Sequence, residues 1–263
     1  MRNVLTFLLL LFSLLCNGQS PKLFTTDKEL SSSLINQIYQ DRNGFIWIAT
    51  EDGLNRYDGA KFTIYKHEPN NEHSLAHNFV RTVFEDSKGH LLIGTYIGIQ
   101  MYDPATDNFT PLAKLEDTGE TLESNINSFI ERKNGEIWVS GNVLCKLDIK
   151  DHLLTVRKVD IAVTSPGSLF EDKKQNVWMA KGEEGVYQLT PDNQLTLHLS
   201  KDNGYVKSIC EDQRGNIYVG SIRKGLFIYD KERKTFVPID LKEKGELPVC
   251  FLYSGIPNEL YIG

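Results

Sequence analysis

Short apolar stretches recur along the chain, and each follows a polar turn. Five of them share one layout, in which an acidic or polar tetrapeptide is followed by four or five apolar residues. They occupy residues 40–50, 85–95, 131–141, 171–181 and 211–221, and a sixth begins at residue 260. The central side chains of the six stretches are Trp47, Leu92, Trp138, Trp178, Tyr218 and Tyr261. No stretch has the 3.6-residue periodicity of an amphipathic helix, so the pattern predicts strands.

The first repeat shows how one unit is built. Strands are predicted over residues 34–40, 45–49, 54–57 and 61–65, with turns at Asp41–Gly44, Glu51–Gly53 and Asp58–Gly59. Asp accepts hydrogen bonds from the backbone ahead of it, and Gly adopts the positive φ that such turns need. Units of four short strands that recur every ~40–46 residues are typical of propeller blades.

The sequence therefore predicts an all-β fold, a β-propeller of four-stranded blades. About five and a half blades are present, and we expect about seven in the closed ring, within the roughly four to eight that propellers have. We predict blades over residues 34–73, 74–123, 124–164, 165–203 and 204–245, and a partial blade over 246–263. Residues 19–33 form a lead-in segment.

The N-terminus has the features of a signal peptide. Arg2 is followed by an apolar run over residues 4–15, which is shorter than the ~20 residues that a membrane span needs. Small residues before Gln19 suit cleavage after Gly18, so residues 1–18 are predicted to be removed on export. No later stretch is long and apolar enough to span a membrane, and we expect a periplasmic protein. It is either free there or tethered through a C-terminal part beyond residue 263.

The turns and the central strands supply the structural anchors of each repeat. The acidic residue fixes the turn, the glycine permits it, and the aromatic residue packs between neighbouring blades, because its strand is apolar on both faces. The predicted anchors are Asp41, Gly44, Trp47, Asp86, Gly89, Trp138, Asp172, Trp178, Asp212, Gly215 and Tyr218. The third and fourth repeats are degenerate, since Arg132 replaces the Asp and Gln175 replaces the Gly.

Charge and metal-ligating residues exclude several functions. The formal net charge is −6, whereas nucleic-acid binders usually present a basic face. His67, His73 and His77 lie in a linker with Pro69, which favours a surface loop over a metal site, so neither a metal nor another cofactor is predicted. No C-x-x-C pair exists, and a disulfide between Cys210 and Cys250 is left open.

Ligand-binding candidates lie where the linkers and the loops after the second strands open on one face of the ring. Binding residues on such scaffolds gather in the loops of one face. Asn, Arg and Tyr suit sugar hydroxyls and ring faces, and the candidates are Arg81, Tyr96, Arg223, Asn36 and Asn127. No pair of carboxylates suited to glycoside cleavage is apparent, and no catalytic residue is predicted.

The first repeat resembles the two-component regulator propeller family. The resemblance lies in Asp41-x-x-Gly44-x-x-Trp47, in residues 50–59 (TEDGLNRYDG) and in the linker at residues 68–75 (EPNNEHSL). It extends over residues 31–263 and is strongest in repeats one, two and five. It implies the periplasmic sensor region of a hybrid histidine kinase, which in this family commonly detects oligosaccharides released from glycans.

The chain departs from that family in extent, because it stops within the sixth repeat and carries no kinase or receiver module. We therefore expect it not to be an enzyme by itself, although a longer parent would be a sensor histidine kinase. The expected partners are an oligosaccharide and either the remainder of a receptor or a second protomer that closes the ring. Two alternatives remain: a secreted propeller that acts as a protein-interaction scaffold, and a propeller lyase or hydrolase.

Overall fold

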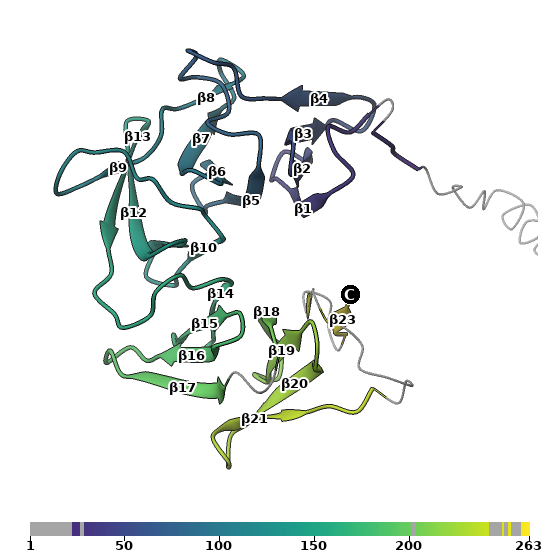
Figure 1. The fold of residues 1–263 in the computed structure, drawn as a ribbon, viewed down its shortest axis with the longest axis vertical. Helices are drawn as coiled ribbons and strands as arrows, with labels where there is room; N and C mark the ends of the chain where they lie inside the picture. The colour runs from purple at the N-terminus through teal and green to yellow at the C-terminus, as the bar shows by residue number, and fades with distance from the viewer. Residues whose placement is uncertain (1–22, 27–28, 201–203, 242–248, 250–251, 254–258) are drawn as a thin grey trace, which may run out of the picture.

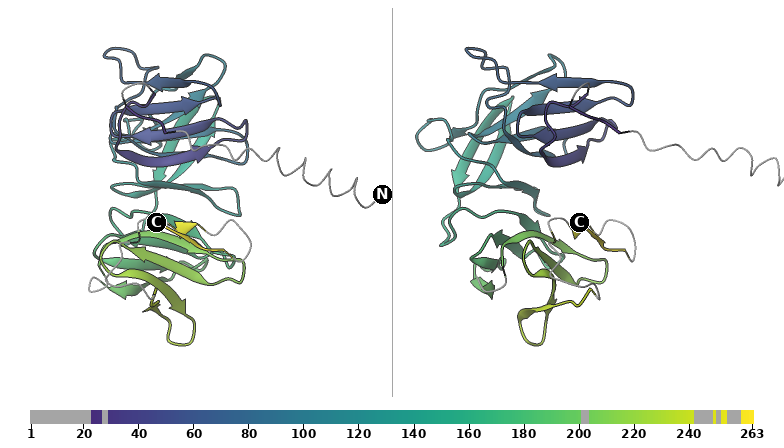
Figure 2. Two further views of the ribbon diagram at one scale, coloured as in Figure 1. Left: turned by 90° about the vertical axis from the view of Figure 1, so that its right-hand side faces the viewer. Right: turned by 45° about the vertical axis from the view of Figure 1, so that its right-hand side comes forward.

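The computed structural model describes residues 23–26, 29–200, 204–241, 249, 252–253 and 259–263. Within this part of the chain the regular elements are all β-strands. Successive sheets follow one another around a common axis and form an open ring (Figure 1). In both views of Figure 2 the first blade lies at one end of the molecule and the fifth at the other. The predicted all-β propeller fold is confirmed.

The first three sheets hold the N-terminal strands. The first blade consists of β1 (Ile35–Gln40), β2 (Ile46–Thr50), β3 (Gly53–Tyr57) and β4 (Phe62–Tyr65). The second consists of β5 (Val80–Glu85), β6 (Leu91–Thr95), β7 (Ile99–Asp103) and β8 (Asn108–Phe109). The third consists of β10 (Ser128–Glu131), β11 (Ile137–Ser140), β12 (Leu144–Lys150) and β13 (Leu153–Lys158), with β9 (Lys114–Leu115) added at its edge.

The remaining sheets follow the same order. The fourth blade consists of β14 (Leu169–Glu171), β15 (Val177–Lys181), β16 (Gly185–Leu189) and β17 (Leu195–Ser200). The fifth consists of β18 (Val206–Glu211), β19 (Ile217–Ser221), β20 (Gly225–Asp230) and β21 (Thr235–Pro238). The last sheet pairs β22 (Leu252–Tyr253) with β23 (Tyr261–Ile262).

The third blade corrects the prediction of four strands in every blade. Its fifth strand, β9, comes from the segment after the second blade and pairs with β13 in parallel, Thr155 opposite Lys114 and Val156 opposite Leu115. The backbone N–H of Glu116 continues this pairing by donating to the carbonyl of Val156. The long connection thereby ties the second blade to the outer edge of the third.

The tryptophans pack between blades, as predicted. Trp47 is fully buried and packs with Val80, Val83 and Leu91 of the second blade. Trp178 is 1% exposed and packs with Phe227 of the fifth blade. Burial of such a side chain stabilises the fold by roughly 2–3 kcal/mol. The central side chain of the second strand therefore contributes to the packing between blades.

In the first, second, fourth and fifth blades, an Asp fixes the turn between the first and second strands. The Oδ1 atom of Asp41 accepts from the backbone N–H groups of Asn43 and Phe45, and its Oδ2 accepts from Nε1 of Trp47 at 2.8 Å. Asp86, Asp172 and Asp212 accept the equivalent pair of backbone bonds. These contacts fix the conformation of the four turns.

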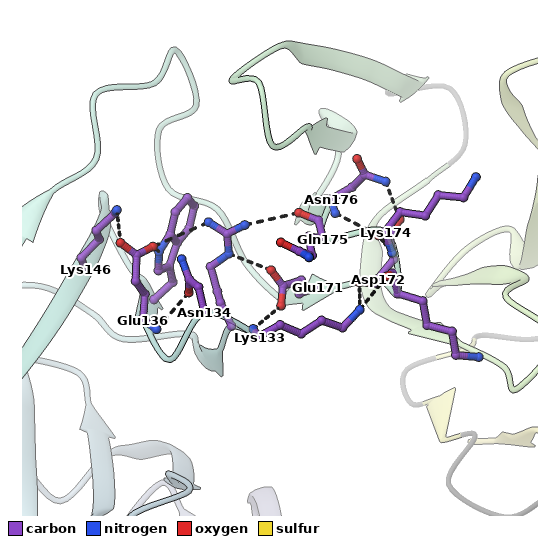
Figure 3. A network of polar contacts seen from close by, with 12 residues as sticks. Lys133, Asn134, Glu136, Lys146, Glu171, Asp172, Lys174, Gln175 and Asn176 are labelled. Carbon is purple, nitrogen blue, oxygen red and sulfur yellow. Dashed lines mark hydrogen bonds and ion pairs between the residues drawn. The ribbon is translucent and has the colours of Figure 1, made fainter.

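The third blade lacks this Asp and satisfies its tryptophan differently (Figure 3). Nε1 of Trp138 donates to Glu136, and the guanidinium of Arg132 lies over the Trp138 ring, 4.6 Å from its centroid. Lys146 forms an ion pair with the same Glu136. Burial alone would raise the pKa of Glu136, but hydrogen bonds from Lys146, Trp138 and Asn134 outweigh it and lower the pKa to about 2.

The same turns join each blade to the next. A Glu at the end of the innermost strand accepts the backbone N–H of a residue in the preceding turn; the four pairs are Arg42–Glu85, Ser87–Glu131, Lys133–Glu171 and Lys173–Glu211. Figure 3 shows the third of these pairs, in which Nζ of Lys133 also donates to the carbonyl of Asp172. This turn face of the ring therefore holds the blades together.

Some predictions fall outside the described residues. The signal peptide over residues 1–18 and Cys250, the second member of the Cys210–Cys250 pair, lie outside them, as does most of the partial blade at 246–263. Cys145 and Cys210 are buried on strands. No helix of the described residues is long and apolar enough to cross a membrane.

Candidate functional site

The predicted ligand-binding residues lie on the face opposite the turn face. The innermost strands β1, β5, β10, β14 and β18 surround the axis of the ring (Figure 1). Each of them runs from the loop face to the turn face, so its first residues reach the loop rim. Asn36, Arg81 and Asn127 lie at or just before these starts, and Tyr96 and Arg223 lie in loops after second strands.

A β-bulge marks the rim end of three innermost strands. The pairing register shifts between Ile35 and Gln37, between Val80 and Thr82, and between Val206 and Ser208. The bulged residues are Asn36, Arg81 and Lys207. A bulge bends the strand and redirects a side chain, and bulges are over-represented next to binding sites.

Two predicted site residues have a structural role. Nδ2 of Asn36 donates to the carbonyl of Val80 at 2.8 Å, and Nδ2 of Asn127 donates to the carbonyl of Pro166 at 3.1 Å. Val80 and Pro166 belong to the following blades, so both amides join neighbouring blades at the loop face. Their contacts therefore explain these residues without a ligand.

Arg81 occupies the equivalent position in the second blade but makes no such bond. Its half-buried guanidinium lies over the ring of Phe79, 5.8 Å from the centroid. Within the described residues no hydrogen bond or ion pair involves the Arg81 side chain. A half-buried guanidinium brings five N–H donors, and those not used within the protein are available to a ligand.

Tyr96 contacts the same Phe79 ring as Arg81 and is 53% exposed. Its ring centroid is 5.6 Å from that of His77 and 6.1 Å from that of Phe79. The backbone N–H of Tyr96 donates to the carbonyl of Phe79, and Nδ1 of His77 accepts from the N–H of Phe79. We call His77, Phe79, Arg81 and Tyr96 the rim cluster.

The structure thus brings Arg81 and Tyr96 together but places Arg223 elsewhere. Arg223 follows β19 in the fifth blade, where its 70% exposed side chain lies 3.4 Å from Glu183 of the fourth blade. Phe79 and His77 were missed by the sequence reasoning. The signal that could have identified Phe79 is its position directly before an innermost strand, where the first and fifth blades have the exposed Leu34 and Tyr205.

A concave region lies outside the rim cluster. A groove of about 800 Å³ is bordered by His67, Glu68, Glu72, Gln100 and Lys114, among others. Nδ1 of His67 contacts the carbonyl of Leu75, and Gln100 is bonded to the backbone of Ser74 and Thr110. His73 likewise contacts the carbonyl of Phe109. Within the described residues no group of three or more His, Cys, Asp or Glu side chains is placed to hold a metal ion.

Sequence comparison identifies the repeats. Residues 29–52, 74–96 and 200–223 match the two-component regulator propeller family. A histidine kinase, P4, from Formosa agariphila is 39% identical over 83 residues, which are 29% of this chain and 6% of that protein. The matches cover the innermost and second strands of the first, second and fifth blades, where the sequence resemblance is strongest.

Structural comparison gives the same architecture. The extracellular domain of a putative hybrid two-component system from B. thetaiotaomicron superposes with a TM-score of 0.74 at 17% identity, covering 93% of this chain and 36% of that one. A catalytically inactive virginiamycin B lyase from Staphylococcus aureus superposes with a TM-score of 0.67 at 12% identity, covering 93% and 80%. At these identities the likeness shows the fold alone. The chain spans about a third of the length of that extracellular domain.

Proposed function

Because this chain is built from two-component regulator propeller repeats, we propose that it is the ligand-sensing segment of a hybrid two-component regulator outside the cytoplasm. It recognises a glycan-derived oligosaccharide at its loop face, and it has no catalytic activity of its own. The signal peptide over residues 1–18 directs it to the periplasm. The matched repeats and the likeness to an extracellular sensor domain support this proposal.

The rim cluster is the main support for a ligand site on the loop face. The turn face is occupied by bonds between blades, and Asn36 and Asn127 make such bonds on the loop face. Arg81 and the exposed ring of Tyr96 have no comparable task. An aromatic ring packs against the apolar face of a sugar, and a guanidinium donates to its oxygens, so the pair suits a saccharide.

The test is a ligand screen on the purified chain. Defined oligosaccharides are added and the shift of the melting temperature is recorded, with Tyr96→Ala as the site variant. Tyr253→Ala removes an equally exposed tyrosine, 49% against 53%, from the last sheet and serves as the control. We expect a saccharide to raise the melting temperature of the parent and the control but not of Tyr96→Ala. Stabilisation by a protein partner and by no saccharide would favour the scaffold alternative.

The lyase alternative rests on the fold likeness to virginiamycin B lyase. A catalytic histidine near the axis would lie on an innermost strand, and β1, β5, β10, β14 and β18 contain none. Turnover of a saccharide by the purified chain that is lost on His77→Asn would support an enzyme instead. We expect binding without turnover.

The ring is completed by further blades of a longer polypeptide. Ile38 on β1 is 62% exposed, whereas its equivalents Val83, Leu169 and Ile209 are 1%, 7% and 9% exposed beneath a preceding blade. The side of the first blade that carries Ile38 thus lacks the cover that the other blades have. The extracellular domain to which the chain is similar is about two and a half times as long.

This proposal predicts a native product well above 29.9 kDa in an immunoblot of membrane fractions. A soluble band near 29.9 kDa would contradict it. In that case a second copy would be the remaining candidate to cover Ile38, and sedimentation of the chain would show a dimer.

A further inference from the structure

The bulge position differs from blade to blade, and the difference is one of charge. The first blade has Asn36 there, the third blade has Asn127 at the equivalent position directly before β10, where the pairing register does not shift, and both amides are engaged with the following blade. The second and fifth blades have Arg81 and Lys207. Both cations therefore replace a residue that holds blades together, at positions that lie on the rim around one axis.

Neither cation is neutralised within the described residues. Lys207 is exposed and Arg81 is half-buried, and no ion pair involves either side chain there. Several carboxylates of the loop face have partners of their own: Asp52 lies 2.5 Å from Lys66, Glu184 lies 2.7 Å from Lys181, and Glu183 pairs with Arg223. Arg81 and Lys207 are thus two cations of the rim without an ion-pair partner within the described residues, on a chain whose overall charge is −6.

We propose that the rim cluster and Lys207 select an acidic saccharide, whose carboxylate or sulfate is bound by Arg81. This inference rests on the proposed function and names the ligand class of the same site. The planar guanidinium donates two parallel N–H bonds to such an anion, and these charge-assisted bonds are stronger than bonds to hydroxyls. Tyr96 packs against the sugar ring that carries the anion, and Lys207 attracts a second acidic residue of the oligomer.

Because Arg81 is half-buried, we expect it to contribute more to anion binding than a fully exposed cation would. The Phe79 ring lies 5.8 Å from the guanidinium of Arg81 and reduces its contact with water on that side. A bound anion therefore competes with fewer water molecules for the N–H donors of Arg81 than it would at an open surface. We expect loss of this interaction to weaken binding by about 10- to 100-fold, the range of a single charged hydrogen-bonded pair.

The experiment measures the binding affinity of the full chain by isothermal titration calorimetry. Three oligosaccharide probes of equal length are used: a galacturonate, a sulfated galactan and a neutral galactan. Arg81→Asn is the site variant, because Asn is the residue found at this position in the first and third blades. It should fold, and it gains an amide that can donate to the following blade. Its melting temperature should equal or exceed that of the parent.

Arg233→Asn is the matched control, since Arg233 is a cation that is 73% exposed on the hairpin between β20 and β21. We expect an acidic probe to bind the parent and the control, with ~10- to 100-fold weaker binding to Arg81→Asn. The galacturonate and sulfated arms show which anion is preferred. Lys207→Asn should cause a smaller loss that disappears as salt is raised, because that side chain is exposed.

The outcomes separate the two proposals. If the neutral probe binds as tightly as the acidic ones, or if Arg81→Asn binds the acidic probe like the parent, selection for an anion is wrong and oligosaccharide sensing stands. If no saccharide of a wider panel binds the parent, the proposed function itself fails.

Discussion

The buried bond between Asp41 and Trp47 gives a sharp test of how one turn stabilises a blade. Asp41 is 8% exposed and accepts three hydrogen bonds, of which the one from Nε1 of Trp47 lies in the core. In Asp41→Ala all three donors lose their acceptor. At about 1–2 kcal/mol for each, with the larger cost at the buried indole, we expect a loss of roughly 4 kcal/mol.

Asp41→Asn separates the indole bond from the backbone bonds. The amide oxygen can still accept from the N–H groups of Asn43 and Phe45, whereas the amide nitrogen then faces the indole N–H of Trp47, donor to donor. We expect this variant to lose about 2 kcal/mol, close to half of the effect of Asp41→Ala. A result equal to the parent would mean that the indole bond contributes nothing.

Equilibrium urea unfolding followed by tryptophan fluorescence measures both variants. With a slope of about 2–3 kcal/mol per M, the loss in Asp41→Ala lowers the midpoint by roughly 1.5 M. Asp58→Ala is the control, because Asp58 accepts from the N–H groups of Ala60 and Lys61 in an exposed turn without an indole. If Asp41→Ala and Asp58→Ala shift the midpoint equally, burial of the bond is not what makes Asp41 important.

Three further predictions concern other parts of the fold. The lowered pKa of Glu136 stabilises the fold at pH values above its unfolded-state pKa of about 4.5, and this stability is lost as the pH falls toward 2. Because Glu136 is partly exposed, urea unfolding should show Glu136→Gln about 1 kcal/mol less stable than the parent at pH 7 and equally stable near pH 2. Burial raises the pKa of the Cys145 thiol to about 11, so iodoacetamide at pH 8 should label it only after denaturation, as peptide mass spectrometry would show. Gly185 has a φ of +124°, and an added Cβ would lie 1.5 Å from the carbonyl oxygen of Leu199, so thermal melting should show Gly185→Ala destabilised by about 3 kcal/mol or more, and an unchanged melting temperature would contradict this.

The fold was largely predictable because the repeat places the same contacts five times. The spacing of the central side chains, and the turn before each of them, determine where a strand starts and which residue is buried. The extra strand β9 was not predictable, because Lys114 and Leu115 have no pattern of their own and pair only where β13 offers a free edge. The local sequence pattern predicts strands well. A strand that pairs with the outer edge of another blade depends on where the fold places the two segments.

The degenerate third repeat shows why a missing motif residue did not remove the blade. Arg132 stands where the other described turns have Asp, yet Trp138 is 3% exposed like its counterparts. The acceptor for its indole comes from Glu136, two residues before it, while Arg132 covers the ring. The physical requirement is an acceptor for a buried N–H, and more than one residue pattern meets it.

The ligand site was predictable only in part, because the sequence gives residue types on the rim but not their partners. Asn36, Asn127 and Arg81 looked alike as polar rim residues; only the contacts separate the two amides that join blades from the guanidinium that does not. Phe79 joins the site through its contacts with Arg81 and Tyr96, and the sequence signals only its position directly before an innermost strand.

The two faces of the ring explain how one scaffold can carry a variable site. On the turn face, Glu85, Glu131, Glu171 and Glu211 repeat one bond from blade to blade, so a substitution there weakens the contact between two blades. On the loop face, the position of Asn36 holds Asn in two blades, Arg in one and Lys in another, and the blades pack in every case. Cohesion therefore depends mainly on the turn face and on the buried second strands. A bulge residue of the loop face is available for binding where it does not join two blades. Arg81 is such a residue, and it belongs to the same cluster as the exposed ring of Tyr96.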